Sequence, residues 1–68
     1  MRYVVVYEHT ARNYSAYVPD LPGCVATGRT RAEVAERIRQ AIALHLEGLR
    51  KEGLSVPEPQ VWTELVEA

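Results

Sequence analysis

Short blocks of apolar residues, separated by polar loops, occupy the first 28 positions of the chain. Residues 3–7 (YVVVY) are β-branched or aromatic throughout, which favours a strand, and their apolar side chains fall on both faces of that strand. Residues 14–18 and 24–28 are two further strand-like blocks, and Asn13 suits the hairpin loop before the first of them. The pattern predicts a three-stranded antiparallel meander.

A sharp turn is predicted in the stretch PDLPGC, between the second and third strands. Pro22 fixes φ for the second position of a type II turn, and Gly23 supplies the positive φ that the third position requires. Asp20 is expected to support the turn through its side-chain oxygen and nearby amides. Leu21 and Cys24 complete this segment, which returns the chain to the sheet.

The period of the apolar positions changes to that of a helix after residue 30. Thr30 and Glu33 form a capping box, which predicts a helix start, and Gly53 predicts its end. The apolar side chains between them cover an arc of about 140°, the width of a core-facing stripe; they are Val34, Ala35, Ile38, Ala41, Ile42, His45, Leu46 and Leu49. Pro57 and Pro59 keep the next residues extended, and residues 61–66 are predicted to form a last strand, giving an α+β fold of order β-β-β-α-β.

The length and composition predict one small domain, residues 1–68, that needs help to be stable. A chain of 68 residues buries only about 60% of its unfolded surface. One cysteine excludes an internal disulfide, and two histidines without CxxC motifs do not make a structural zinc site, so self-association is the expected supplement. The net charge of −1 predicts no direct nucleic-acid binding, and the absence of a signal or membrane-spanning segment predicts a soluble, cytoplasmic protein.

Candidate catalytic groups are few. Cys24 would need a base within reach, and neither His9 nor His45 has the spacing of a known Cys–His arrangement, so a packing role is expected for the thiol. Glu8 and Asp20 are the only acids expected near the sheet, and two carboxylates of undefined geometry make a weak metal site. No metal or cofactor is predicted.

Five exposed or aromatic side chains are candidates for contacts with a partner or with another copy of the chain. Aromatic anchors tend to concentrate binding energy, which selects the tyrosines of the predicted sheet, although these serve equally well as core residues. Leu44 lies about 130° from the centre of the apolar stripe, where it is either an ordinary surface residue or a contact with another chain. The candidates are Tyr3, Tyr7, Tyr14, Tyr17 and Leu44.

The sequence resembles the HicB-like antitoxins. The resemblance rests on a strand ending in Tyr17-Val18, the block Asp20-Leu21-Pro22-Gly23-Cys24, a small-residue strand ending in Gly28, the helix opening at Thr30, and the Gly53 and Pro57-Glu58-Pro59 exit. It covers nearly the whole chain and resembles the short form, without the C-terminal DNA-binding domain of longer relatives.

The resemblance implies a partial ribonuclease-H-like fold without catalytic carboxylates and a role as a non-enzymatic antitoxin. It implies that a HicA-type messenger-RNA ribonuclease is the partner, neutralised by steric occlusion, and that the chain self-associates as a dimer or tetramer. Two alternatives stay open: a small metal-dependent nuclease that uses Glu8 and Asp20, and a stand-alone structural homo-oligomer.

Overall fold

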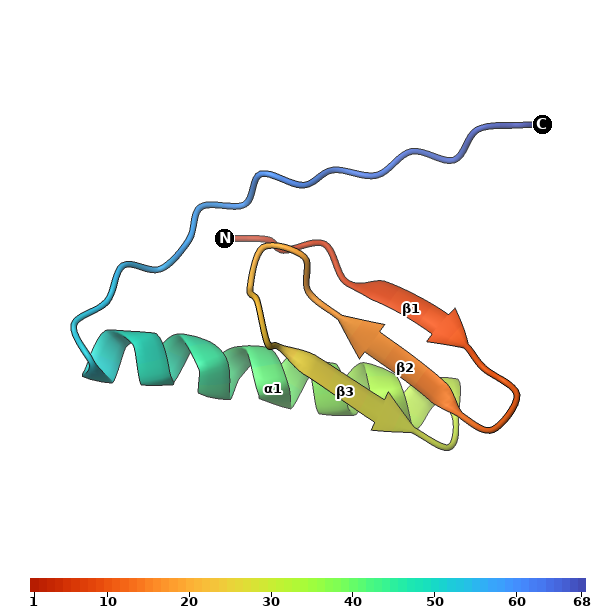
Figure 1. Ribbon diagram of the computed structural model, residues 1–68, viewed down its shortest axis with the longest axis horizontal. Helices are drawn as coiled ribbons and strands as arrows, with labels where there is room; N and C mark the ends of the chain where they lie inside the picture. Colours follow the sequence, from red (N-terminus) through yellow and green to blue (C-terminus); the bar gives the residue numbers. More distant parts are fainter.

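Three short strands and one long helix make up the fold in the computed structural model, which describes residues 1–68. Strands β1 (Val6–His9), β2 (Tyr14–Tyr17) and β3 (Val25–Gly28) form an antiparallel sheet in the order β1-β2-β3. Helix α1 (Arg31–Lys51) follows and packs across β3 and β2 (Figure 1). The predicted meander and helix are therefore confirmed.

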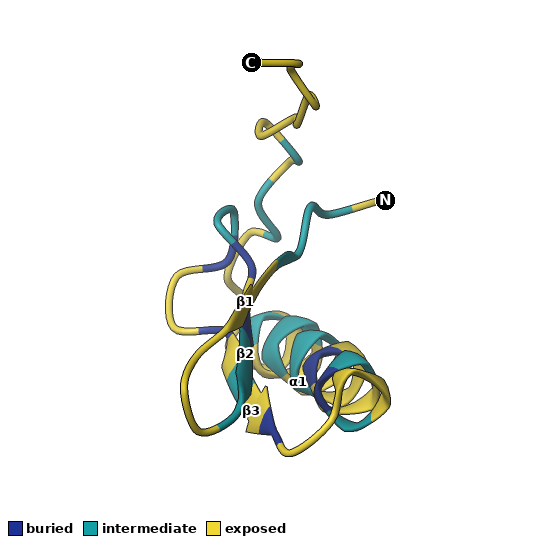
Figure 2. Ribbon diagram, turned by 90° about the vertical axis from the view of Figure 1, so that its right-hand side faces the viewer, coloured by how far each residue is buried: buried dark blue, intermediate teal, exposed yellow.

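The two faces of the sheet differ because only one of them is covered. Ala16 is buried, and its neighbour Tyr17 is 41% exposed, so β2 presents Ala16 to the helix and Tyr17 to the other side. Figure 2 shows the helix on one face of the sheet and no helix or strand on the opposite face. We call that opposite side the open face.

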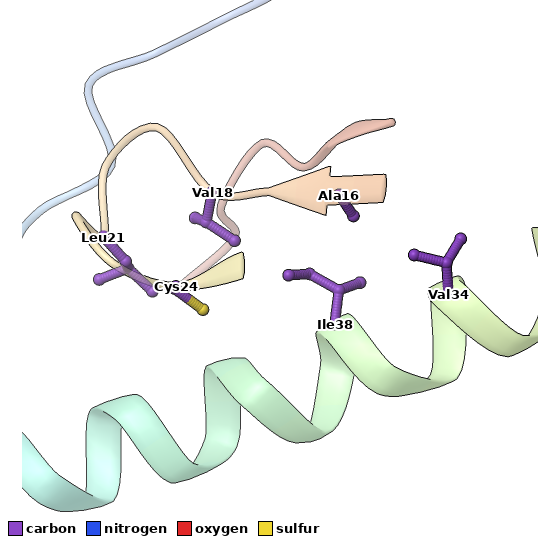
Figure 3. Close-up of a cluster of buried hydrophobic side chains, with 6 residues drawn as sticks. All are labelled: Ala16, Val18, Leu21, Cys24, Val34 and Ile38. Carbon is purple, nitrogen blue, oxygen red and sulfur yellow. The ribbon is translucent and has the colours of Figure 1, made fainter. Parts of the chain in front are cut away.

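The core is a cluster of six buried side chains between the sheet and the first half of the helix (Figure 3). Val34 and Ile38 project from α1 toward side chains of β2 and of the turn that follows it. Beyond Ile38, the apolar stripe of α1 is only half-buried, since a helix of 21 residues is much longer than strands of four. The cluster consists of Ala16, Val18, Leu21, Cys24, Val34 and Ile38.

The turn between β2 and β3 has the predicted geometry. The amide of Cys24 donates to the carbonyl of Leu21 at 3.0 Å, and Gly23 between them has a φ of 87°. Pro22 and Gly23 are thus the central residues, as a type II turn requires. A second turn precedes it, in which the Leu21 amide donates to the carbonyl of Val18 at 3.0 Å.

Helix α1 begins and ends close to the predicted positions. The Thr30 side chain accepts a hydrogen bond from the Glu33 amide at 3.0 Å, while Glu33 Oε1 accepts from the amide of Arg29 rather than from that of Thr30. At the other end, the amides of Gly53 and Leu54 donate to the carbonyls of Arg50 and Leu49. This is a Schellman motif, and Gly53 takes the left-handed conformation that it needs, with φ at 71°.

Close packing joins the end of β3 to the start of α1. A Cβ added to Gly28 would lie 2.7 Å from the Val34 amide nitrogen and 3.0 Å from the Val34 Cα. Only glycine therefore fits at the end of β3 without moving the helix away. Helix α1 does not combine the length and the apolar composition that a membrane-spanning helix requires.

Two strand predictions were wrong in whole or in part. Residues 61–66 are extended but pair with no strand, so the structure has the order β-β-β-α, without the predicted C-terminal strand. Residues 3–5 also lie outside the ladder, and β1 instead runs from Val6 to His9. The reason is that the chain after Tyr17 has no free partners to offer, since the Val18 amide donates to Cys24, the Val18 carbonyl accepts from Leu21, and Pro19 has no amide hydrogen.

Candidate partner-binding site

The turn of residues 20–24 contributes two side chains to the hydrophobic core. Leu21 and Cys24 are buried, at 0% and 3% exposure, and both belong to the core cluster (Figure 3). Burial raises the pKa of the Cys24 thiol, which disfavours the reactive thiolate. His9 stacks on Tyr14, with ring centroids 4.3 Å apart, and His45 is half-buried on α1. These positions favour packing as the role of Cys24.

Asp20 has a function that the sequence did not reveal. Its Oδ2 atom accepts hydrogen bonds from the backbone amides of Gln60 and Val61, both at 3.2 Å. The expected bonds to amides of its own turn are replaced by bonds to amides 40 and 41 positions away. Asp20 therefore attaches the C-terminal segment, residues 55–68, to the turn.

The acidic side chains do not converge. Glu8 is exposed on β1, where it lies opposite Ser15, whereas one oxygen of Asp20 already bonds two amides. No three histidine, cysteine, aspartate or glutamate side chains lie close enough to hold a metal ion. The residues present thus offer no ready-made set of ligands for a metal.

The four tyrosines fall into three environments rather than one patch. Tyr3 packs against the core cluster, and its hydroxyl donates to the carbonyl of Pro57. Tyr7 lies opposite Ala16, which places both Tyr7 and Tyr14 on the helix side of the sheet. Tyr17 alone projects from the open face.

An apolar row crosses the open face. Tyr17 is paired with Val6 on one side and with Val25 on the other, so the three side chains project together. Val25 is 64% exposed and Tyr17 is 41% exposed. The sequence alone did not select Val6 or Val25, because membership of this row depends on the register of all three strands.

A groove lies on the other side of the sheet, where α1 does not reach β1. It has a volume of about 230 Å³ and is lined by Tyr7, Tyr14, Arg31, Val34 and Ala35. Four of these five side chains are hydrophobic, and Arg31 supplies the one charge. The groove suits a single large aromatic side chain better than a polar ligand.

The exposed face of α1 is largely neutralised by its own ion pairs. Glu33 pairs with Arg37 at 3.3 Å, and Glu47 pairs with Lys51 at 3.1 Å, each in the i,i+4 arrangement that suits a helix. Leu44 is 69% exposed on this face, as its place on the helical wheel predicts. Whether Leu44 contacts another chain stays a prediction.

The C-terminal segment presents the most exposed apolar side chains of the molecule. Trp62 is 84% exposed and Leu65 fully so, and Val66 is exposed as well. In Figures 1 and 2, this segment leaves the body of the protein and extends away from it. It is held at its base by Tyr3 and Asp20 and makes no backbone pairing beyond them.

The open face, the apolar groove and the unpaired extended segment are the surfaces that this α+β fold leaves uncovered. A family model described as HicB-like antitoxin of bacterial toxin-antitoxin system matches residues 3–68. The chain belongs to this family of HicB-like antitoxins.

Relatives and a solved structure agree with this family. A UPF0150 protein of Thermoplasma acidophilum is 34% identical over 58 residues, which cover 84% of each chain. An uncharacterized 14.9 kDa protein of Haemophilus phage HP1 is 33% identical over 58 residues, and this chain spans only 44% of its length. A chain in a solved HicA3 and HicB3 toxin-antitoxin complex matches with a TM-score of 0.73 and 32% identity, over 87% of this chain and 70% of that one.

Proposed function

We propose that this chain is an antitoxin that binds a HicA-type toxin and blocks its ribonuclease surface by steric occlusion. The observation that carries the proposal is the match to a chain of a HicA3 and HicB3 complex, at 32% identity and over most of both chains. The exposed apolar row on the sheet supports it, because a binding module needs an accessible anchor. The alternative of a metal-dependent nuclease has less support, because no three candidate ligand side chains lie close enough to hold a metal ion.

The toxin would dock on the open face, centred on Tyr17. This face is flat and uncovered, and the row of Val6, Tyr17 and Val25 gives it an apolar centre. Glu8, Ser15 and Thr27 form a polar row beside it, since they too are paired with one another across the strands. An apolar centre with a polar rim is the usual anatomy of a specific interface, which needs about 800 Å² from each partner.

The test is inhibition of a purified HicA-type toxin, taken from the neighbourhood of this gene, in an RNA-cleavage assay. The wild-type chain is expected to abolish cleavage near a one-to-one ratio, and Tyr17→Ala should weaken binding about thirtyfold or more, as loss of a central aromatic anchor does. Leu44→Ala removes an apolar side chain from the helix that is more exposed than Tyr17, and it serves as the control.

Three outcomes would contradict this proposal. Undiminished cleavage at saturating wild-type chain would exclude occlusion of that toxin. Inhibition that is lost with Leu44→Ala but retained with Tyr17→Ala would move the interface to the helix. Cleavage of RNA by the chain alone in magnesium, lost with Asp20→Asn, would favour the nuclease alternative.

A further inference from the structure

The groove between β1 and α1 is open because the helix packs against β2 and β3 but not against β1. Tyr7 and Tyr14 line it from the sheet, and Val34 and Ala35 line it from the helix. Arg31, the first residue of α1, is its one charged lining residue. We propose that this groove binds a small aromatic carboxylic acid in its ionised form, with the ring among the apolar side chains and the carboxylate on Arg31.

The guanidinium of Arg31 has no partner within the chain. Arg37 and Arg39 of the same helix each pair with a glutamate, at 3.3 Å and 3.7 Å, whereas Arg31 makes no ion pair. A cation in the first turn of a helix is also opposed by the helix dipole, so the stability of α1 does not account for this arginine. A carboxylate is the complementary ligand, because the fork of guanidinium donors matches its two oxygens.

The size and lining of the groove favour a single ring with a short acid chain. A volume of about 230 Å³ holds roughly ten non-hydrogen atoms at the packing density of protein interiors. The two tyrosine rings offer edge and face contacts to an aromatic ring, and the nearby guanidinium adds a cation–π contact. An aliphatic acid of the same length would gain neither.

A second hollow beside the groove favours one negative charge over two. This hollow has a volume of about 260 Å³ and extends toward His9, and Arg31 lines both spaces. A carboxylate on Arg31 would thus lie where the two spaces meet. Glu8 also lines the second hollow, and its negative charge repels a phosphate, which carries about two negative charges, more strongly than a monocarboxylate.

No other part of the chain fills this groove. The C-terminal segment is held by Tyr3 and Asp20 beside the start of β1, whereas the groove lies toward the end of that strand (Figure 1). The open face lies on the other side of the sheet. The ligand site therefore does not depend on the proposed function, and a toxin on the open face would leave it accessible.

An NMR titration of the full chain with 3-phenylpropionate tests the proposal. A ligand of this size is expected to bind with a dissociation constant of about 1 mM. Its ring should shift the methyl signals of Val34 and Ala35 through ring currents. The neutral 3-phenylpropionamide should bind about three- to tenfold more weakly, because it lacks the charge that pairs with Arg31. Propionate, which has no ring, should produce no saturable shift of these methyl signals.

Two variants separate the roles of the charge and of the cavity. Arg31→Gln should bind the acid and the amide equally and keep the wild-type melting temperature, since the side chain of Arg31 makes no ion pair in the chain. Arg39→Gln removes the same charge from the same helix, outside the groove, and is the matched control that should keep the preference for the acid. Ala35→Leu fills the groove and should abolish binding of both compounds.

Four results would overturn the ligand site. Equal binding of the acid and the amide by the wild type would exclude a role of Arg31, and no saturable shift at about ten times the expected dissociation constant would exclude binding. Shifts centred on Val6 and Val25 would place the ligand on the open face. Binding that weakens as the protein concentration rises would show that a second copy of the chain covers the groove. Each of these results leaves the toxin assay with Tyr17→Ala unaffected.

Discussion

Replacing Gly28 by alanine should destabilise the protein, although alanine is usually the better residue for stability. The added Cβ would lie 2.7 Å from the Val34 nitrogen, and every atom within 3.0 Å belongs to the backbone of α1. A backbone atom cannot rotate away, so the first turn of the helix must shift and loosen the packing of the buried Val34 side chain. Overpacking of this kind costs about 1–3 kcal/mol, which outweighs the gain of about 0.4–1 kcal/mol from the stiffer unfolded chain.

Urea and thermal unfolding, followed by circular dichroism at one fixed chain concentration, measure this effect. We expect a lower urea midpoint, and a melting temperature lowered by about 4–8 °C for each kcal/mol lost. Gly48→Ala is the matched control, because Gly48 lies within α1 and its Cβ would meet nothing within 4 Å. This control should gain about 0.5–1 kcal/mol. A Gly28→Ala variant as stable as Gly48→Ala would refute the close contact between β3 and α1.

Three further predictions concern the cap, the anchor and the thiol. Thr30→Ala removes the hydrogen bond from the Glu33 amide and should lower the free energy of unfolding, measured in urea, by about 1 kcal/mol. Thr63→Ala, in the extended C-terminal residues, is the control. It should leave the urea midpoint at the wild-type value when the chain is studied as a monomer. Asp20→Ala should raise hydrogen exchange at the Gln60 and Val61 amides about tenfold, with no change at amides of α1. Burial raises the pKa of Cys24 in the folded chain, so the thiol of the unfolded chain ionises at a lower pH. The contribution of the Cys24 thiol to the free energy of unfolding is therefore fully present below the ordinary cysteine pKa. It is lost as the pH rises through the raised pKa of the folded chain. Cys24→Ala should remove this decrease of the free energy of unfolding with rising pH. An unchanged decrease in the variant would assign it to other groups.

Local signals explain why most of the fold was predictable. The capping residue Thr30, the period of the helix and the Pro22-Gly23 turn each act within a few residues, so the sequence contains the whole of the physical cause. Glycine at position 53 likewise ends the helix by its own backbone preference.

The errors concern features whose cause lies elsewhere in the chain. A strand needs a partner, and the pattern of residues 61–66 does not say where that partner is. Asp20 bonds amides 40 positions away, which no local pattern indicates. The separation of the tyrosines was unpredictable for the same reason, because the register that separates Tyr7 from Tyr17 involves two strands and the helix that covers one face.

The sequential order of the strands and helix has a consequence for assembly kinetics. Each strand pairs with its neighbour in the chain, and the helix then closes over them, so folding requires only short loops to form. The Tyr3 and Asp20 anchors join residues 54 and 40 positions apart and are not needed for any of these steps. The body of residues 6–54 should therefore fold first and fast, and the extended C-terminal residues should attach to it only afterwards, through Tyr3 and Asp20.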